Sequence, residues 1–375
     1  MPVERIQLPE GVPPLTTYYV YLTAGCNLAC RHCWLAPSFQ PNGGTGGHLD
    51  YQLFELAIEE GLPLGLSSVK LTGGEPLLHP DFVRMVDLLR EKELGLTIET
   101  NGTLLTESLA RYLKDKSTLR FISVSLDGAV PETHDAFRGV KGSFERAVQG
   151  IRHLVAVGYR PQVIMSLHAG NVDEIEPLVR LAEELGAGSV KFNLVQPTGR
   201  GEVMTNRGQV LDIRRLIELG KWVEKDLQKR STVNLFYSWP MAFHSLRRLM
   251  SDGLDRCAIM NILGILATGH VAMCGIGVHT QNLCYGLLGK DPIGNVWIHH
   301  RMLIELRQSI PQQLEGICGE CIVRDNCMGS CIASNYHLTN SLFSPFWFCY
   351  LADGVGAFPR SRKRNTFDKN QGGVE

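Results

Sequence analysis

Three cysteines at short fixed spacing constrain this chain more than any other feature of its sequence. Cys26, Cys30 and Cys33 form a C-x3-C-x2-C run, and an aromatic residue, Trp34, follows. Iron–sulfur clusters are held by cysteine thiolates at such spacings, and three thiols in one loop leave the fourth iron of a four-iron cluster without a local ligand. A zinc site is the alternative, but it needs four ligands in a closed tetrahedron, and His32 is badly placed between two of the thiols. The spacing favours an iron–sulfur cluster with one open iron.

The composition is that of an ordinary globular protein with no sign of a nucleic-acid or membrane partner. The chain has 375 residues, 44% hydrophobic and 20% charged, and a formal net charge of −1. Such a balance creates no field that attracts nucleic acid or a membrane. No apolar run approaches the roughly 20 residues of a membrane-spanning helix, and the N-terminus lacks a signal-peptide core. Because eleven cysteines occur without an export signal, they indicate metal binding in a reducing cytoplasm.

Strands and helices are expected to alternate along the first part of the chain. β-branched and aromatic residues predict strands at 17–24, 68–72, 96–100, 121–126, 162–167 and 190–195. Helices are predicted at 50–61, 81–92, 107–114, 143–157, 172–185 and, as an amphipathic barrel cover, 209–229. Such alternation indicates a parallel sheet wrapped by helices. Six units are fewer than the eight of a closed barrel. We therefore expect an α/β fold, and we expect residues 233–237 to lead out of its core.

Candidate ligand-binding residues stand where the predicted strands end or in the segments that follow: Gly73, Gly74, Glu75, Asn101, Ser125, Asp127, Arg138 and Ser166. In parallel α/β barrels the sites lie at the C-terminal ends of the strands. The two glycines let the backbone approach a ligand closely, and the Glu75 carboxylate can accept from an ammonium group. Each feature alone is compatible with a turn or a helix cap. Their joint occurrence after successive strands indicates a binding site.

The cysteine run and these motifs together resemble the signature of the radical S-adenosylmethionine (radical SAM) enzymes. The matching segments are the cysteine loop, GGEP at 73–76, TNG at 100–102, SLDG at 125–128 and H-D-x-x-R-G at 134–139. The resemblance implies that Cys26, Cys30 and Cys33 hold a 4Fe–4S cluster whose open iron binds S-adenosylmethionine (SAM). It also implies that an electron from the cluster cleaves SAM to a 5′-deoxyadenosyl radical, and that an external donor such as a flavodoxin or ferredoxin supplies this electron.

The same resemblance assigns the eight candidate residues to SAM. Glu75 and the backbone of the two glycines are expected to hold the methionine amino group. Ser125 and Asp127 are expected near the ribose and the carboxylate. Arg138 could pair with the SAM carboxylate through its planar fork. No side chain is singled out as a catalytic base.

The remaining cysteines form a second constellation nearer the C-terminus. Seven of them resemble the pattern of the SPASM domain, which binds auxiliary 4Fe–4S clusters: Cys257, Cys274, Cys318, Cys321, Cys327, Cys331 and Cys349. The resemblance implies an outer cluster on Cys318, Cys321, Cys327 and Cys349, and an inner cluster on Cys257, Cys274 and Cys331. The inner cluster is then one ligand short, so either Cys284 completes it or one iron faces the substrate cavity. A zinc ribbon at 318–331 is the alternative, because zinc takes C-x2-C pairs, but it leaves the other three cysteines unexplained.

These resemblances predict the domain order and one partner. An N-terminal extension (1–14) precedes the radical SAM core (15–235), for which the resemblance implies a partial (β/α)6 barrel. A linker with the SPASM region (236–352) leads to a polar C-terminal tail (353–375). The short extension has no room for the leader-binding domain with which some peptide maturases begin. A separate small leader-peptide-binding protein is therefore expected as a partner.

Within the radical SAM enzymes, the sequence most resembles the maturases of ribosomally synthesised peptides. The run from Leu22 to Trp34 looks like that of the SynChlMet-type members. Gly275 stands just after Cys274, where sulfatase maturases carry an aspartate base, which argues against sulfatase maturation. The favoured function is hydrogen abstraction from a precursor peptide followed by oxidative modification such as a crosslink. The alternatives are a radical SAM enzyme acting on a small molecule or cofactor precursor, such as a modified tetrapyrrole, and a non-enzymatic metal or electron-transfer protein.

Overall fold

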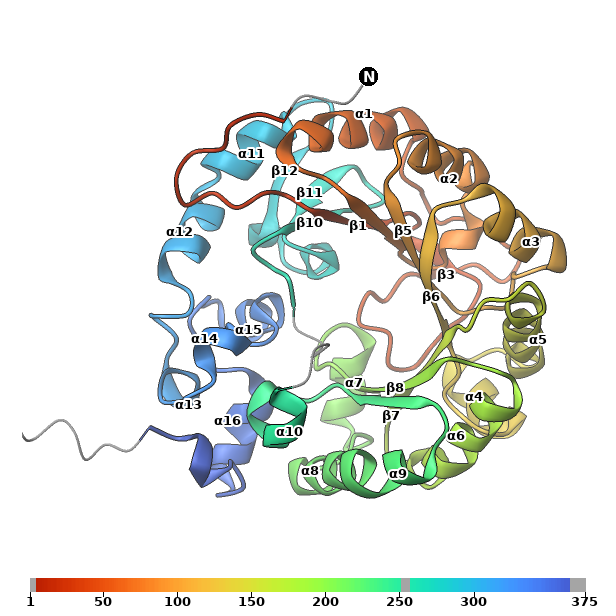
Figure 1. Cartoon of the computed structure of the whole chain (residues 1–375), viewed down its shortest axis with the longest axis vertical. Coiled ribbons are helices and arrows are strands. Elements are labelled where there is room, and N and C mark those ends of the chain that lie inside the picture. The colour runs from red at the N-terminus through yellow and green to blue at the C-terminus, as the bar shows by residue number, and fades with distance from the viewer. Residues whose placement is uncertain (1–4, 251–256, 365–375) are drawn as a thin grey trace, which may run out of the picture.

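One curved sheet organises the molecule (Figure 1). The computed structural model describes residues 5–250 and 257–364. Within these ranges ten strands pair in the order β12-β11-β10-β1-β4-β5-β6-β7-β8-β9. They are β1 (Thr17–Tyr21), β4 (Ser68–Thr72), β5 (Gly95–Thr100), β6 (Leu119–Ser125), β7 (Gln162–Leu167), β8 (Ser189–Leu194), β9 (Asn234–Tyr237), β10 (Ile262–Ile265), β11 (His270–Ala272) and β12 (Cys284–Leu287). A separate parallel pair, β2 (Gly25–Cys26) and β3 (Ser38–Phe39), carries the first cysteine.

Helices connect the strands, and most of those between β1 and β9 lie outside the arc of the sheet (Figure 1). In the first part of the chain they are α1 (Tyr51–Gly61), α2 (Phe82–Glu91), α3 (Glu107–Lys116), α4 (Pro131–Arg138), α5 (Ser143–Ala156), α6 (Ile175–Glu184), α7 (Arg200–Asn206), α8 (Ile213–Trp222), α9 (Gln228–Arg230) and α10 (Leu246–Leu249). Several begin at a side-chain cap: Asp50 accepts from the amides of Gln52 and Leu53, and Thr106 accepts from that of Leu109. Such caps satisfy amides that have no partner within the helix.

The C-terminal part of the chain is mostly helical after β12. It contains α11 (Ile293–His299), α12 (Arg301–Ser309), α13 (Gly316–Gly319), α14 (Arg324–Cys327), α15 (Ile332–Thr339) and α16 (Trp347–Gly354). Figure 1 shows these helices facing the open side of the arc. One continuous hydrophobic core joins both parts, from Val69 of β4 to Trp297 of α11 and Phe348 of α16. The fully buried Trp297 also donates to the carbonyl of Pro13 at 2.9 Å, which ties α11 to the segment before β1.

The predicted α/β fold is confirmed, and each of the six predicted strands is present as β1, β4, β5, β6, β7 or β8. Three predictions need correction. Residues 233–237 do not lead out of the sheet, because β9 pairs in parallel with β8. The predicted strand 17–24 ends at Tyr21, since the chain then turns to bond with residues 47–49 instead. The long helix expected at 209–229 begins at Ile213, where Asp212 caps it, and widens to a π-turn at Val223–Leu227.

Strand direction places the candidate site. Every neighbouring pair from β10 through β1 to β9 runs parallel, while β11 and β12 are antiparallel additions at one end. The carboxyl ends of the parallel strands therefore meet along one edge of the sheet. Strand β9 crosses the proposed boundary at 235, so the division into a barrel and a SPASM region stays a prediction. No helix in the described ranges has the length and apolar character needed to traverse a bilayer.

Candidate active site

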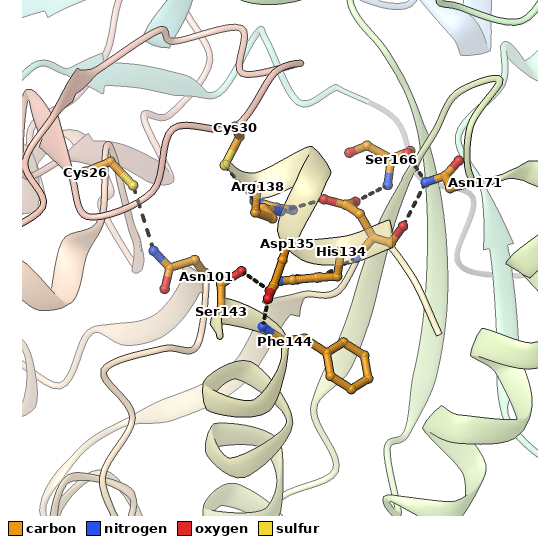
Figure 2. Close-up of polar contacts among 11 residues, drawn as sticks. Cys26, Cys30, Asn101, His134, Asp135, Arg138, Ser143, Phe144, Ser166 and Asn171 are labelled. Atoms are coloured by element: carbon orange, nitrogen blue, oxygen red, sulfur yellow. Dashed lines mark hydrogen bonds and ion pairs between the residues drawn. The ribbon is translucent and has the colours of Figure 1, made fainter. Parts of the chain in front are cut away.

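The cysteine run forms a loop packed against α4 at the carboxyl edge of the sheet. Cys26 and Cys30 are buried, and Cys33 is half-buried. The amides of Ala29 and Arg31 donate to the carbonyls at the end of α4, at 3.0 and 2.9 Å. Two donors reach the sulfur of Cys26, the amide of Leu28 at 3.4 Å and Nδ2 of Asn101 at 3.8 Å (Figure 2). N–H donors aimed at sulfur suit a thiolate that ligates iron.

The GGEP turn packs against this loop. A Cβ at Gly74 would lie 1.8 Å from the carbonyl oxygen of Gly25, and Gly73 has φ +132°, so both positions require glycine. The fully buried Glu75 carboxylate accepts from Thr100 Oγ1 at 2.6 Å, from the Asn101 amide at 2.8 Å and from the Leu77 amide at 3.2 Å. Burial raises the pKa of Glu75 to about 7 despite these donors. Glu75 thus holds the turn after β4 to the end of β5, and its contact with SAM stays a prediction.

Asp127 and Arg138 meet each other in a buried ion pair. Arg138 Nε lies 2.5 Å from Asp127 Oδ2, and Arg138 Nη1 donates to Cys30 Sγ at 3.4 Å (Figure 2). The other Asp127 oxygen accepts from the Ser166 amide at 2.7 Å. Although burial opposes it, the Arg138 guanidinium lowers the pKa of Asp127. In the structure the guanidinium contacts a carboxylate and a cysteine of the loop. The SAM contacts of both residues stay a prediction.

The other predicted SAM residues lie around the same edge. Ser125 is half-buried at the end of β6, and Ser166 is buried near the end of β7. Sequence reasoning did not single out Asp135, which accepts from Ser143 Oγ at 2.7 Å and from the Phe144 amide at 2.8 Å. Asp135 lies inside one helix and caps the next, and such an aspartate does not show the usual pattern of a cap residue directly before its helix. The only hint in the sequence is that the H-D pair stands shortly before the G-S-F segment.

Three aromatic rings stack beside the cysteine loop. His32 lies on Phe137 with centroids 4.4 Å apart and planes at 7°, and Phe137 lies on His168 at 4.0 Å and 17°. Burial lowers the pKa of His32 to about 3, so the ring is neutral at pH 7. In the described chain several buried polar atoms nearby have no hydrogen-bond partner: His32 Nδ1, His168 Nε2, Gln196 Oε1, Thr198 Oγ1, and Arg200 Nε and Nη2. Because buried polar atoms are normally paired, these atoms are available to hydrogen-bond a polar ligand.

The downstream cysteines fall into two sets. The four-thiol set, Cys318, Cys321, Cys327 and Cys349, lines one small cavity. The three-thiol set is Cys257, Cys274 and Cys331. Burial of the Cys257 thiol raises its pKa, and the neighbouring Cys331 and Cys274 thiols add to this shift, although part of the residue is open to solvent. Cys284 lies apart, with Sγ donating to the Gly277 carbonyl at 3.4 Å. Among the described residues, no three Cys, His, Asp or Glu side chains converge on the position of a single metal ion.

An aromatic pair connects the first cysteine loop to Cys274. Tyr21 and Trp34 meet edge to face, with ring centroids 6.1 Å apart. A Cβ at Gly275 would lie 2.4 Å from the Tyr21 ring and 2.6 Å from Trp34. The space in which an aspartate at 275 would project is therefore filled by the two rings.

A cleft of about 820 Å³ opens beside this junction, at the ends of β1, β4 and β10. Gly73 and Gly74 line one side, and Cys284 and Tyr285 of β12 line another. Lys290, with Asp291 beside it, is the one Lys or Arg in the described lining. The cleft therefore reaches from the glycine turn to the C-terminal part of the chain and carries little net charge.

Comparison with known proteins agrees with this geometry. The Radical SAM superfamily profile matches residues 20–184. The AdoMet-dependent heme synthase of Methanosarcina barkeri is 30% identical over 349 residues, 89% of this chain and 95% of that protein. The mycofactocin maturase MftC of Mycobacterium tuberculosis is 29% identical over 96% of this chain and 90% of its own. The fold is similar to that of Streptococcus suis SuiB bound to the precursor peptide SuiA, with TM-score 0.69 and 18% identity over 90% of this chain and 76% of SuiB. The chain belongs to the radical SAM superfamily of enzymes.

Proposed function

We propose that this enzyme is a peptide maturase, which removes hydrogen from a precursor peptide and so introduces an oxidative modification such as a crosslink. Its similarity to mycofactocin maturase over 96% of the chain supports this class of substrate. A flavodoxin or ferredoxin is the proposed electron donor, and a separate leader-binding protein is a proposed partner.

The proposed cofactor residues each have a defined task. Cys26, Cys30 and Cys33 hold a 4Fe–4S cluster, which together with SAM supplies the electron and the 5′-deoxyadenosyl radical for hydrogen abstraction. The Phe137 ring, stacked on His32, presents an apolar surface beside the cysteine loop. Gly73 and Gly74 keep the turn close to the cysteine loop. The two downstream thiol sets are proposed to hold auxiliary 4Fe–4S clusters, as in a SPASM region.

The low charge of the cleft favours a peptide over a tetrapyrrole as the substrate. A tetrapyrrole precursor bears several carboxylates, and a site for it requires several cationic side chains to pair them. The cleft offers Lys290, which has Asp291 next to it. Its other described lining residues are mostly small, apolar or uncharged polar residues, and these suit an extended peptide segment.

Heme synthesis is the second candidate, favoured by the 30% identity to the heme synthase of Methanosarcina barkeri. One assay separates the two. The anaerobically reconstituted enzyme is incubated with SAM, dithionite and either a candidate precursor peptide, sought as a short open reading frame beside its gene, or an iron porphyrin precursor of heme. A peptide maturase yields 5′-deoxyadenosine together with a peptide that has lost the mass of two hydrogen atoms.

The control is Cys30→Ala, which we expect to abolish both products. Conversion of the iron porphyrin to heme, seen in the absorption spectrum, with an unchanged peptide mass would replace the maturase proposal by the heme synthase one. Adding the candidate leader-binding protein tests the partner, because peptide affinity must then increase.

A further inference from the structure

Arg138 is held at a cysteine of the loop by the protein itself. Its side chain is 8% exposed, and its ion pair with the fully buried Asp127 spans 2.5 Å. The Ser166 amide fixes the other Asp127 oxygen at 2.7 Å, and Nδ2 of Asn171 holds the Asp127 carbonyl at 2.9 Å. With Nε committed to Asp127, Nη1 faces Cys30 Sγ at 3.4 Å (Figure 2). The donor is therefore oriented toward the sulfur before any cofactor binds.

We propose that Arg138 is a positioning residue that acts through Cys30 and sets the reduction potential of the cluster. This rests on the proposed ligand role of the three loop cysteines. Transfer of one electron from a low-potential donor adds one negative charge to the bound cluster, part of it on the thiolate sulfurs. A charge-assisted hydrogen bond stabilises the more negative state more strongly than the oxidised state. Arg138 therefore raises the midpoint potential and makes the reduction that precedes SAM cleavage easier.

The cysteines of the loop differ in their donors, which makes the effect specific to one residue. Cys26 receives a backbone amide and a neutral side-chain amide, from Leu28 and Asn101. Cys30 receives a guanidinium. Arg31, the next residue along the chain, is exposed and donates to Gln209 Oε1 at 3.0 Å. Arg31 therefore supplies a control that has the same charge near the loop.

The test is an EPR-monitored redox titration of the full-length reconstituted enzyme, following the reduced signal that responds to added SAM. Arg138→Gln should weaken the reduced state relative to the oxidised state by about tenfold, which corresponds to a midpoint potential lower by about 59 mV for one electron. Arg31→Gln should leave the potential unchanged. Because Arg138→Gln leaves Asp127 buried without its partner, the double variant Asp127→Asn/Arg138→Gln provides a second measurement in which the pair stays neutral.

The proposal is overturned if the midpoint potential of Arg138→Gln is unchanged. If Arg138→Gln does not retain a cluster, an unchanged midpoint potential in the double variant overturns the proposal. An equal shift in Arg31→Gln also overturns it, since charge alone would then account for the effect. A wrong assignment of the loop cysteines as cluster ligands would give a different result. In that case Cys30→Ala would keep both the SAM-responsive EPR signal and the full iron content of the enzyme.

Discussion

At the scale of single residues, Gly275 shows how packing excludes a side chain next to Cys274. The resemblance drawn from the sequence places it where sulfatase maturases carry an aspartate, and in the structure any side chain there meets the rings of Tyr21 and Trp34. A Cβ would lie 2.4 Å from Tyr21 and 2.6 Å from Trp34, and both rings pack against buried neighbours. The Tyr21 and Trp34 rings, which connect the two cysteine regions, thus occupy the space that an aspartate at position 275 would need.

We predict that Gly275→Ala destabilises the protein by about 1–3 kcal/mol, the usual cost of overpacking a filled interior. The measurement is the thermal unfolding midpoint followed by circular dichroism. Gly354→Ala is the matched control, because nothing lies within 4 Å of a Cβ there and the residue ends α16. An unchanged midpoint in Gly275→Ala would show that Tyr21 and Trp34 move aside freely.

The candidate site could be predicted in its residues but not in its contacts. The strand-end motifs placed Glu75, Asp127 and Arg138 at one edge of the sheet, and the structure brings them there. The contacts of each side chain depend on which buried charged group lies nearest in space. Arg138 contacts Asp127 and Cys30, which are 11 and 108 positions away in the sequence. A one-dimensional motif does not carry that distance information.

At the scale of elements, one carboxylate joins the helix that supports the cysteine loop to the next helix. Asp135 of α4 accepts from the Gly142 and Phe144 amides and from Ser143 Oγ at the start of α5 (Figure 2). Burial opposes ionisation, but the donors from Ser143, Phe144 and Gly142 lower the pKa of Asp135. The cap therefore fixes the direction in which α4 presents Arg138.

We predict that Asp135→Ala lowers the free energy of unfolding by about 2 kcal/mol. The exposed cap of α1 provides the comparison, and Asp50→Ala should cost about 1 kcal/mol. Because the folded pKa of Asp135 is lowered, its contribution is present above the ordinary value of 3.8 and is lost as the pH falls below it. Urea titrations at pH 7 and near pH 3 measure the difference; an equal effect at both pH values would contradict the capping role.

The fold could be predicted where a single segment carries a periodic pattern. The six strands and most helices have such patterns, and the structure contains them. The two added parallel neighbours could not be placed in this way. Strand β9 reads as a short β-rich run whose partner is not encoded locally, and β10 pairs with β1 although Thr17 and Ile262 are far apart in sequence. The pairing of these distant segments satisfies the backbone N–H and C=O groups along the edges of β1 and β8, which would otherwise be left unpaired.

At the scale of the whole molecule, the C-terminal part is joined to the barrel by a shared sheet and core. β10 extends the parallel sheet beyond β1, and Ile293 at the start of α11 donates to Glu60 at the end of α1 at 2.6 Å. The three-thiol set includes Cys274, next to the Tyr21–Trp34 pair, whereas the four-thiol set lines a separate cavity in the C-terminal helices. The chain therefore places three groups of thiols in succession from the cysteine loop outward.

This succession predicts how iron responds to single substitutions. Cys349→Ser should remove about four iron atoms per chain while leaving the SAM-responsive EPR signal, because Cys349 belongs to the four-thiol set, which lines its own cavity. Cys284→Ser is the second variant: its sulfur donates to the Gly277 carbonyl, and we expect its iron content to be unchanged.

Iron and sulfide analysis of the reconstituted variants decides between the two arrangements of the inner cluster. Unchanged iron in Cys284→Ser means that the three-thiol set holds its cluster with one iron open toward the cleft, where a substrate group can reach it. Loss of about four irons in that variant would instead make Cys284 the missing ligand and close the cluster to substrate. The cleft lined by Cys284 would then serve to seat the peptide, and the auxiliary cluster would serve only to accept its electron.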